Sequence, residues 1–209
     1  MGFGVNRAAM LELLAEAMEV PVSRRPAFLG RFQHLQRLSL IEGISPGRGK
    51  AAEYQAHHVM VIALALQMLQ LGLTPERAVE TINQNRARVR EAIGLAVSRE
   101  GNISPSLFWF DPSVLTKFMD ESEFSDLAEA TFDFGDAEES MRMFKHFFVD
   151  GYLQRSAFIS VSGTLWHIVG VLDGFEEGKI RPKIAEQSLK LLAALSEWFD
   201  SSDPAWTDG

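Results

Sequence analysis

The chain has 209 residues, enough to bury a substantial hydrophobic core, and its 46% hydrophobic and 23% charged residues are ordinary for a folded protein. It contains no cysteine, which excludes disulfides, thiolate metal sites and a cysteine nucleophile. Its formal net charge is −8, which taken alone disfavours a nucleic-acid partner.

The first seventy or so residues contain features that indicate the cellular location of the protein. Residues 1–6 are glycine-rich and are followed by a segment with three glutamates, unlike a secretory signal peptide. The longest apolar run, residues 59–73, contains two glutamines and is shorter than the roughly 18 to 20 residues that a membrane span needs. We therefore expect a cytoplasmic protein with no membrane partner and no cofactor.

Charge is distributed unevenly along the chain. Residues 1–100 carry 12 lysines and arginines against 9 acidic residues, a net charge of +3, whereas residues 101–209 carry a net charge of −11. Within residues 20–60 the net charge is +4. A basic stretch supplies the attraction to phosphate that DNA binding requires, and an acidic remainder limits indiscriminate adhesion. The alternative interpretation is a solvated basic face.

The chain opens with two predicted helices separated by a short turn. Apolar residues at helical spacing predict a helix over residues 8–20, which Pro21 ends. Ser23 is placed to cap a second helix over about residues 24–38. The apolar side of that second helix carries Phe28, Phe32, Leu35 and Leu38.

A glycine-rich loop and two further helices follow. Residues 45–50 read Ser-Pro-Gly-Arg-Gly-Lys, which predicts an exposed loop. The long apolar run predicts a buried helix that stops at Gly72, a residue suited to a left-handed C-cap. Thr74 and Pro75 favour the start of another helix, whose pattern continues to about Ser98.

The second half favours short strands that lead into helices. Aromatic and β-branched residues predict strands over residues 106–110 and 157–161, and Ser162 can cap a helix after the second strand. A last amphipathic helix is predicted over residues 184–199, and the tail from residue 201 onward is expected to fray.

These elements predict a mainly α protein in two parts. Residues 1–100 form a helical domain, and residues 101–209 form a small acidic α+β domain of helices with a few short strands. The expected boundary lies at residues 101–105.

The order of elements in residues 8–85 resembles the winged helix-turn-helix module of the MerR-like DNA-binding family. The resemblance rests on helix, four-residue turn, helix, basic glycine-rich loop, tyrosine, apolar helix and the sequence Leu-Gly-Leu-Thr-Pro-Glu at residues 71–76. In that family the second helix enters the major groove, the loop is a wing that touches the DNA backbone, and the protein binds DNA as a dimer.

The resemblance implies a set of DNA-binding residues on the second helix and the wing. They are Arg24, Arg25, Arg31, Gln33, His34 and Arg37 on the helix, Arg48 and Lys50 on the wing, and Tyr54 after it. Arginines reach phosphates, whereas Gln33 and His34 carry groups that read base edges. On a helical wheel Arg31 falls near Leu35, so part of its stem is also placed to pack on the core.

The expected function is a sequence-specific DNA-binding transcriptional regulator that acts as a homodimer on double-stranded DNA. The acidic second half would serve dimerisation, signal reception or contact with RNA polymerase or another protein. The competing interpretation is an adaptor whose winged helix and second half bind proteins and not DNA. A third, an enzyme, would need a pocket that gathers His146, His167 and acidic side chains.

Other patterns give weaker signals for chemistry, and we do not expect an enzyme. The glycine-rich loop is not a phosphate loop, because Ile44 replaces its first glycine and Ala51 its Ser or Thr. Glu53 and His57 have the spacing of two metal ligands, but no third ligand has supporting spacing. An aromatic and methionine stripe is open to two interpretations, core or partner surface. Its members are Met141, Met143, Phe144, Phe147 and Phe148.

Overall fold

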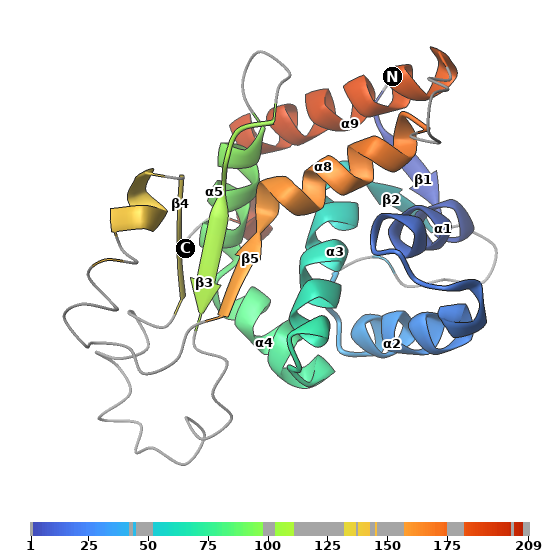
Figure 1. The fold of residues 1–209 in the computed structure, drawn as a ribbon, viewed down its shortest axis with the longest axis horizontal. Helices are drawn as coiled ribbons and strands as arrows, with labels where there is room; N and C mark the ends of the chain where they lie inside the picture. Colours follow the sequence, from blue (N-terminus) through green and yellow to red (C-terminus); the bar gives the residue numbers. More distant parts are fainter. Residues whose placement is uncertain are drawn as a thin grey trace.

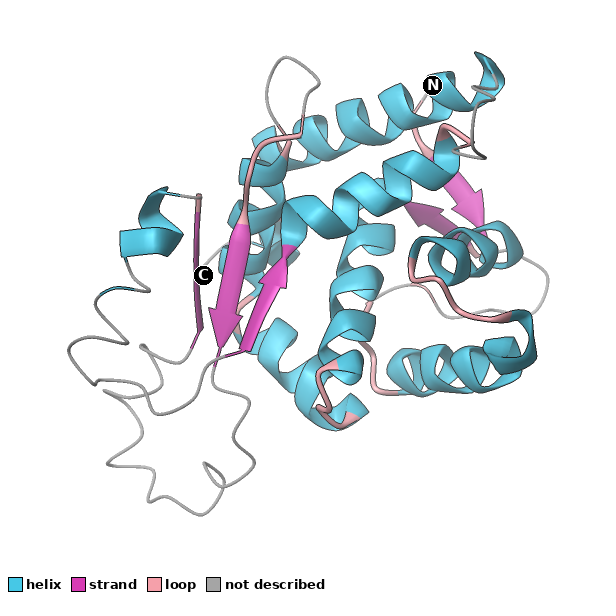
Figure 2. Ribbon diagram, viewed as in Figure 1, coloured by secondary structure: helices cyan, strands magenta, loops and turns pink. Residues whose placement is uncertain are grey.

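The computed structural model describes residues 2–41, 44, 52–97, 103–110, 132–136, 138–142, 145, 157–174, 182–201 and 203–206. Over these residues the protein is mainly helical with two small antiparallel sheets (Figures 1 and 2). No helix in this described part is long and apolar enough to cross a membrane.

The helices and strands follow in chain order. The helices are α1 (Arg7–Ala17), α2 (Arg25–Arg37), α3 (Ala56–Gln70), α4 (Pro75–Gln84), α5 (Arg86–Ala96), α8 (Val161–Leu172) and α9 (Pro182–Asp200), with short 3-10 turns η1 (Val22–Arg24) and η3 (Pro204–Trp206). The strands are β1 (Gly4–Asn6), β2 (Glu53–Gln55), β3 (Leu107–Phe110), β4 (Phe132–Gly135) and β5 (Ala157–Ser160).

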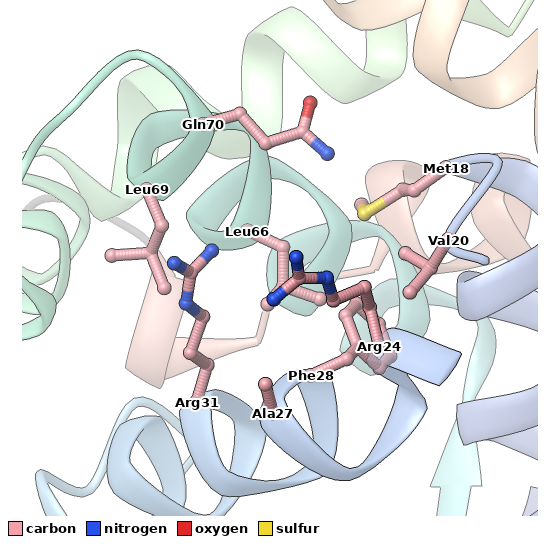
Figure 3. A pocket seen from close by; sticks show the side chains of 9 residues that line it. All are labelled: Met18, Val20, Arg24, Ala27, Phe28, Arg31, Leu66, Leu69 and Gln70. Carbon is pink, nitrogen blue, oxygen red and sulfur yellow. The ribbon is translucent and has the colours of Figure 1, made fainter. Parts of the chain in front are cut away.

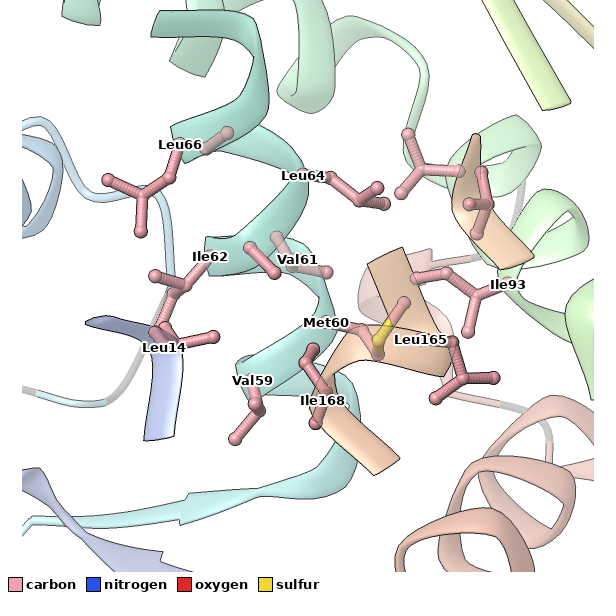
Figure 4. Close-up of a cluster of buried hydrophobic side chains, with 14 of the residues drawn as sticks. Leu14, Val59, Met60, Val61, Ile62, Leu64, Leu66, Ile93, Leu165 and Ile168 are labelled. Atoms are coloured by element: carbon pink, nitrogen blue, oxygen red, sulfur yellow. The ribbon is translucent and has the colours of Figure 1, made fainter. Parts of the chain in front are cut away.

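Helix α3 forms the centre of the core because it is apolar on nearly every side, as predicted. Figure 4 shows Leu14 of α1, Ile93 of α5 and Leu165 of α8 gathered around it, all of them buried. Because it is buried on all sides, we expect this helix to be the part of the fold most sensitive to substitution. Truncating a core leucine or isoleucine to alanine lowers the free energy of unfolding by roughly 2–5 kcal/mol.

The two charge-defined halves of the chain share this core. Helix α8 packs on α1, α3 and α5, and helix α9 packs on α3 and α5. In Figure 1 both late helices lie across the elements formed by the first hundred residues. The two sides of the expected boundary at residues 101–105 therefore differ in net charge, but their described residues share one hydrophobic core.

Both sheets are small and antiparallel. Strand β1 pairs with β2, with Val5 opposite Tyr54, and the other sheet has the order β4-β3-β5. Strands β3 and β5 agree with the strands predicted from their aromatic and β-branched residues. Strands β1, β2 and β4 were not predicted, because the three residues of β1 and of β2 are too few for a recognisable alternation and β4 falls in the acidic stretch.

Several predicted helix ends are confirmed and others are wrong. Gly72 adopts a left-handed φ of 96°, and the Thr74 side chain caps α4, as expected. The single helix expected from Thr74 to about Ser98 is broken at Asn85, whose side-chain amide donates to the Thr81 carbonyl at 2.8 Å. Ser23 caps nothing, because it lies within η1.

Two further predictions in the second half are corrected. Ser160 and not Ser162 caps α8, since its hydroxyl oxygen accepts a hydrogen bond from the Gly163 amide at 2.8 Å. The tail does not fray over residues 203–206: Trp206 is buried and meets Trp198 edge to face, with ring centroids 5.6 Å apart. An indole that covers a core tryptophan anchors the chain end.

Candidate nucleic-acid interface

Helix α2 lies at the periphery of the molecule, below α1 and to the right of the lower part of α3 in Figure 1. Its inner side buries Phe32 and Leu35, while Phe28 is half-buried. This i, i+4, i+7 spacing places all three on one face, as predicted. The helix is therefore held by an apolar stripe and presents its other side to solvent.

The outer face of α2 consists of exposed residues at helical spacing. Pro26, Gly30, Gln33 and Arg37 follow one another at intervals of four, three and four, and all are exposed. A Cβ built on Gly30 would meet no atom within 4 Å. Two of the predicted DNA-binding residues, Gln33 and Arg37, thus share one open face, whereas Arg31 lies about a third of a turn away, toward Phe28.

Arg24, Arg31 and Arg37 are exposed and form no hydrogen bond or ion pair with any residue that the structure describes. Arg24 ends η1 just before α2, and Arg31 follows two turns later. The three guanidinium groups therefore retain their full hydrogen-bonding capacity, five N–H donors each. Such a set is chemically suited to phosphate or carboxylate.

Arg25 has a different environment from its neighbours. Its guanidinium pairs with Glu12 of α1 and lies 3.8 Å from a carboxylate oxygen of Glu16. These contacts hold the start of α2 against the acidic side of α1. A phosphate would have to compete with two carboxylates for this side chain, so the structure assigns Arg25 a positioning role.

His34 and Glu76 connect α2 to the start of α4. His34 Nε2 lies 3.1 Å from a carboxylate oxygen of Glu76, and both side chains are partly exposed. The pKa of Glu76 is lowered, first by the hydrogen bond from its own backbone N–H and also by Thr74 and His34. An acidic group at a helix N-terminus is favoured by the helix dipole. One ring nitrogen of His34 is therefore already occupied.

Tyr54 lies in the core and not on the surface. It is 1% exposed, and its hydroxyl accepts a hydrogen bond from Gln36 Nε2 at 2.5 Å. Burial raises the pKa of this phenol, and its ring is 6.2 Å from that of Phe32. A side chain so deeply buried cannot reach DNA, which corrects the contact expected for Tyr54. Its role is to hold α2 against β2.

The expected wing and most of the aromatic stripe lie outside the described residues. Arg48 and Lys50 lie outside the described residues, as do Met143, Phe144, Phe147 and Phe148. Met141 is exposed. His146 is likewise outside the described part, and His167 is exposed on α8.

The adjacent histidines of α3 serve the fold. His57 is buried and stacks on Trp198, with centroids 4.8 Å apart and planes 7° from parallel. His58 Nδ1 accepts a hydrogen bond from the Gln55 amide and completes a capping box. Burial lowers the pKa of His57 to about 4 and that of His58 to about 3. No group of three metal-ligating side chains occurs among the described residues, so the Glu53 and His57 spacing gains no support.

Sequence reasoning missed Gly30 and Gln36. A glycine within a helical pattern is a usable signal, because it lowers helix stability unless something else requires it. The Gln36 contact had no such signal, since it depends on the position of Tyr54 eighteen residues later.

Comparison with known protein families, curated proteins and solved structures finds no match to this chain. The indications of function in this chain are therefore the surface of α2 and the resemblance of residues 8–85.

Proposed function

We propose that the protein is a sequence-specific DNA-binding transcriptional regulator with a MerR-like winged helix-turn-helix, and that it reads DNA with the outer face of α2. The observation that carries this proposal is the set of exposed, unpartnered arginines on and beside a peripheral 13-residue helix. Arg31 and Arg37 lie on the helix, and Arg24 precedes it.

Three properties of α2 suit it to a DNA groove. Its length of 13 residues corresponds to about 20 Å, and a single helix fits the major groove. Its cations supply attraction to phosphate that does not depend on sequence. Gln33 stands among them on the exposed face, and a glutamine amide both donates to and accepts from the edge of adenine.

Gly30 gives independent support. Glycine within an exposed helix costs roughly 1 kcal/mol relative to alanine, and the open space around Gly30 shows no packing reason for it in this chain. A helix that lies against another molecule gains from a missing side chain, because the two backbones then approach more closely. The glycine is therefore consistent with a bound partner at the middle of α2.

The rest of the proposal follows from the resemblance and the charge distribution. The protein would act as a homodimer on a two-fold operator, since two recognition helices then meet successive major grooves. Its acidic second half would receive a signal or contact another protein such as RNA polymerase, and would limit nonspecific binding through its net charge of −11.

The test is fluorescence-anisotropy titration of the purified protein with a pool of genomic duplex fragments at two salt concentrations, followed by sequencing of the retained DNA. We expect binding that weakens as salt rises, and enrichment of one palindromic sequence. Retention of DNA without enrichment of one sequence would show that binding is not sequence-specific. Absence of DNA binding at low salt would rule out the proposed DNA-binding function.

One observation favours the competing function, a protein-interaction adaptor. Val22 is 76% exposed in η1, next to the arginines, which is unusual for an aliphatic side chain on a DNA-facing surface. An adaptor would show no salt-dependent affinity for duplex DNA. The same titration therefore discriminates the two functions.

A further inference from the structure

A hollow of about 240 Å³ lies between the end of α1, helix α2 and helix α3 (Figure 3). Its apolar lining comes from three elements, with Met18 after α1, Phe28 on α2, and Leu66 and Leu69 on α3. Ligand pockets combine an apolar lining with a few convergent polar groups, and this hollow has both.

The polar groups are Gln70 of α3 and two arginines, Arg24 just before α2 and Arg31 on it. Arg24 and Arg31 both line the hollow, and Figure 3 shows their side chains extending into it. Among the residues that the structure describes, none that lines the hollow is acidic, and neither arginine has a partner there. Two like charges held together repel each other, and an anion between them removes that repulsion.

We propose that this hollow binds a small amphipathic organic anion. Its carboxylate or sulfonate would lie between Arg24 and Arg31, and its apolar body would cover Phe28, Leu66 and Leu69. The hollow is smaller than the roughly 300–1,000 Å³ of pockets for drug-sized ligands, so a short acyl chain or a single ring system fits it better than a nucleotide.

Binding of this anion would regulate the DNA-reading face. This part rests on the proposed function, because Arg24 and Arg31 belong both to the hollow and to the predicted DNA-binding set. A guanidinium that holds the anion is no longer available to a phosphate, so anion and DNA compete, and each weakens the other's binding by the same factor.

The direct test uses octanoate as the probe, followed by backbone amide NMR of the full-length protein without DNA. We expect saturable shifts at Leu69 and Gln70, and weaker responses to 1-octanol, which lacks the charge, and to acetate, which lacks the chain. The double variant Arg24→Gln/Arg31→Gln should bind octanoate at least about tenfold more weakly, because two charge-assisted hydrogen-bond sites are lost.

Arg37→Gln is the matched control, because Arg37 lies on the same helix but does not line the hollow. It should bind octanoate as the wild type does. Equal binding of octanoate by the double variant, equal binding of 1-octanol by the wild type, or no shifts at Leu69 and Gln70 would overturn the anion site.

The regulatory part is tested by anisotropy with the enriched duplex at increasing octanoate. We expect DNA affinity to fall in the wild type, and 1-octanol to leave it unchanged. Simultaneous binding of octanoate and DNA without mutual weakening would overturn the competition. If no duplex binds at all, the DNA function fails, while the NMR titration still decides whether the hollow binds an anion.

Discussion

Arginine has opposite surroundings in two regions of this molecule. At α2, Arg24, Arg31 and Arg37 are exposed and have no partner among the described residues. At α5, Arg90 is 6% exposed and donates to the carbonyls of Trp198 at 3.0 Å, Phe199 at 2.9 Å and Ser201. The contrast separates cations that build the fold from cations that remain available to another molecule.

The position of Arg90 follows from the physics of helix ends. The last carbonyls of a helix lack backbone partners, and the helix dipole places partial negative charge there. Arg90 meets both needs at the end of α9 and lies 5.6 Å from the Trp198 ring. It joins α9 to α5, so the late helix closes a core that the first hundred residues begin.

Replacing Arg90 should give the largest loss of stability. Arg90→Met retains much of the apolar stem but leaves buried carbonyls without a donor, and we expect the free energy of unfolding to fall by about 4 kcal/mol. Urea denaturation measures this. Arg142→Met is the matched control, because Arg142 is exposed and pairs with Glu139 at 3.3 Å and with no other described residue, and it should change stability by less than about 0.5 kcal/mol. Equal effects of the two substitutions would remove the distinction between the two kinds of arginine.

Acid should destabilise the fold where α9 joins the core, because His57 of α3 stacks on Trp198 of α9. The pKa of His57 is lowered to about 4 by burial, so below its unfolded value of 6.5 the unfolded chain takes up a proton that the folded chain excludes. Stability is therefore fully present above pH 6.5 and is lost as pH falls toward 4, by about 3 kcal/mol from this group.

A matched variant isolates that effect from the carboxylates. His57→Phe keeps a ring against Trp198 but cannot titrate. Denaturation at pH 7 and pH 4 should show the wild type losing about 3 kcal/mol more than the variant. Parallel losses in the two proteins would show that His57 does not cause the acid sensitivity.

Replacing Gly30 should give the smallest change in stability, and it tests whether the exposed face of α2 contacts another molecule. Gly30→Ala should stabilise the fold by roughly 0.5–1 kcal/mol, because alanine favours helix and the space around it is open. The same methyl group should weaken duplex binding. Thermal unfolding and anisotropy measure the two effects. A more stable protein with unchanged DNA affinity would show that no close approach occurs at this position.

Local sequence signals predicted most of the helical fold. Helical spacing located α1, α2, α3 and α9, and the Gly72 and Thr74-Pro75 signals correctly separated α3 from α4. These signals succeed because the features they predict depend on neighbours within a few residues. Strand β1 carried no such signal, because it exists only through pairing with β2 some fifty residues later.

The site was harder to predict than the helices. The sequence indicated that Arg24, Arg25, Arg31 and Arg37 surround α2, but the ion pairs of Arg25 with α1 depend on how two helices meet. Tyr54 was assigned a DNA contact by resemblance and lies in the core, where its hydroxyl accepts a hydrogen bond from Gln36. Nothing local distinguishes a buried Arg90 from an exposed Arg31, since both lie among helical residues of mixed polarity.

The most direct test of the central claim is the salt dependence of duplex binding by Arg31→Gln/Arg37→Gln, measured by anisotropy beside Arg142→Gln. The segment that contains Arg142, residues 138–142, is drawn in gold at the left of Figure 1, away from α2 at the right. If the exposed arginines on this face of the protein contact phosphates, the slope of log affinity against log salt should fall by about two units in the double variant and remain unchanged in the control. An unchanged slope in the double variant would contradict DNA binding by this face.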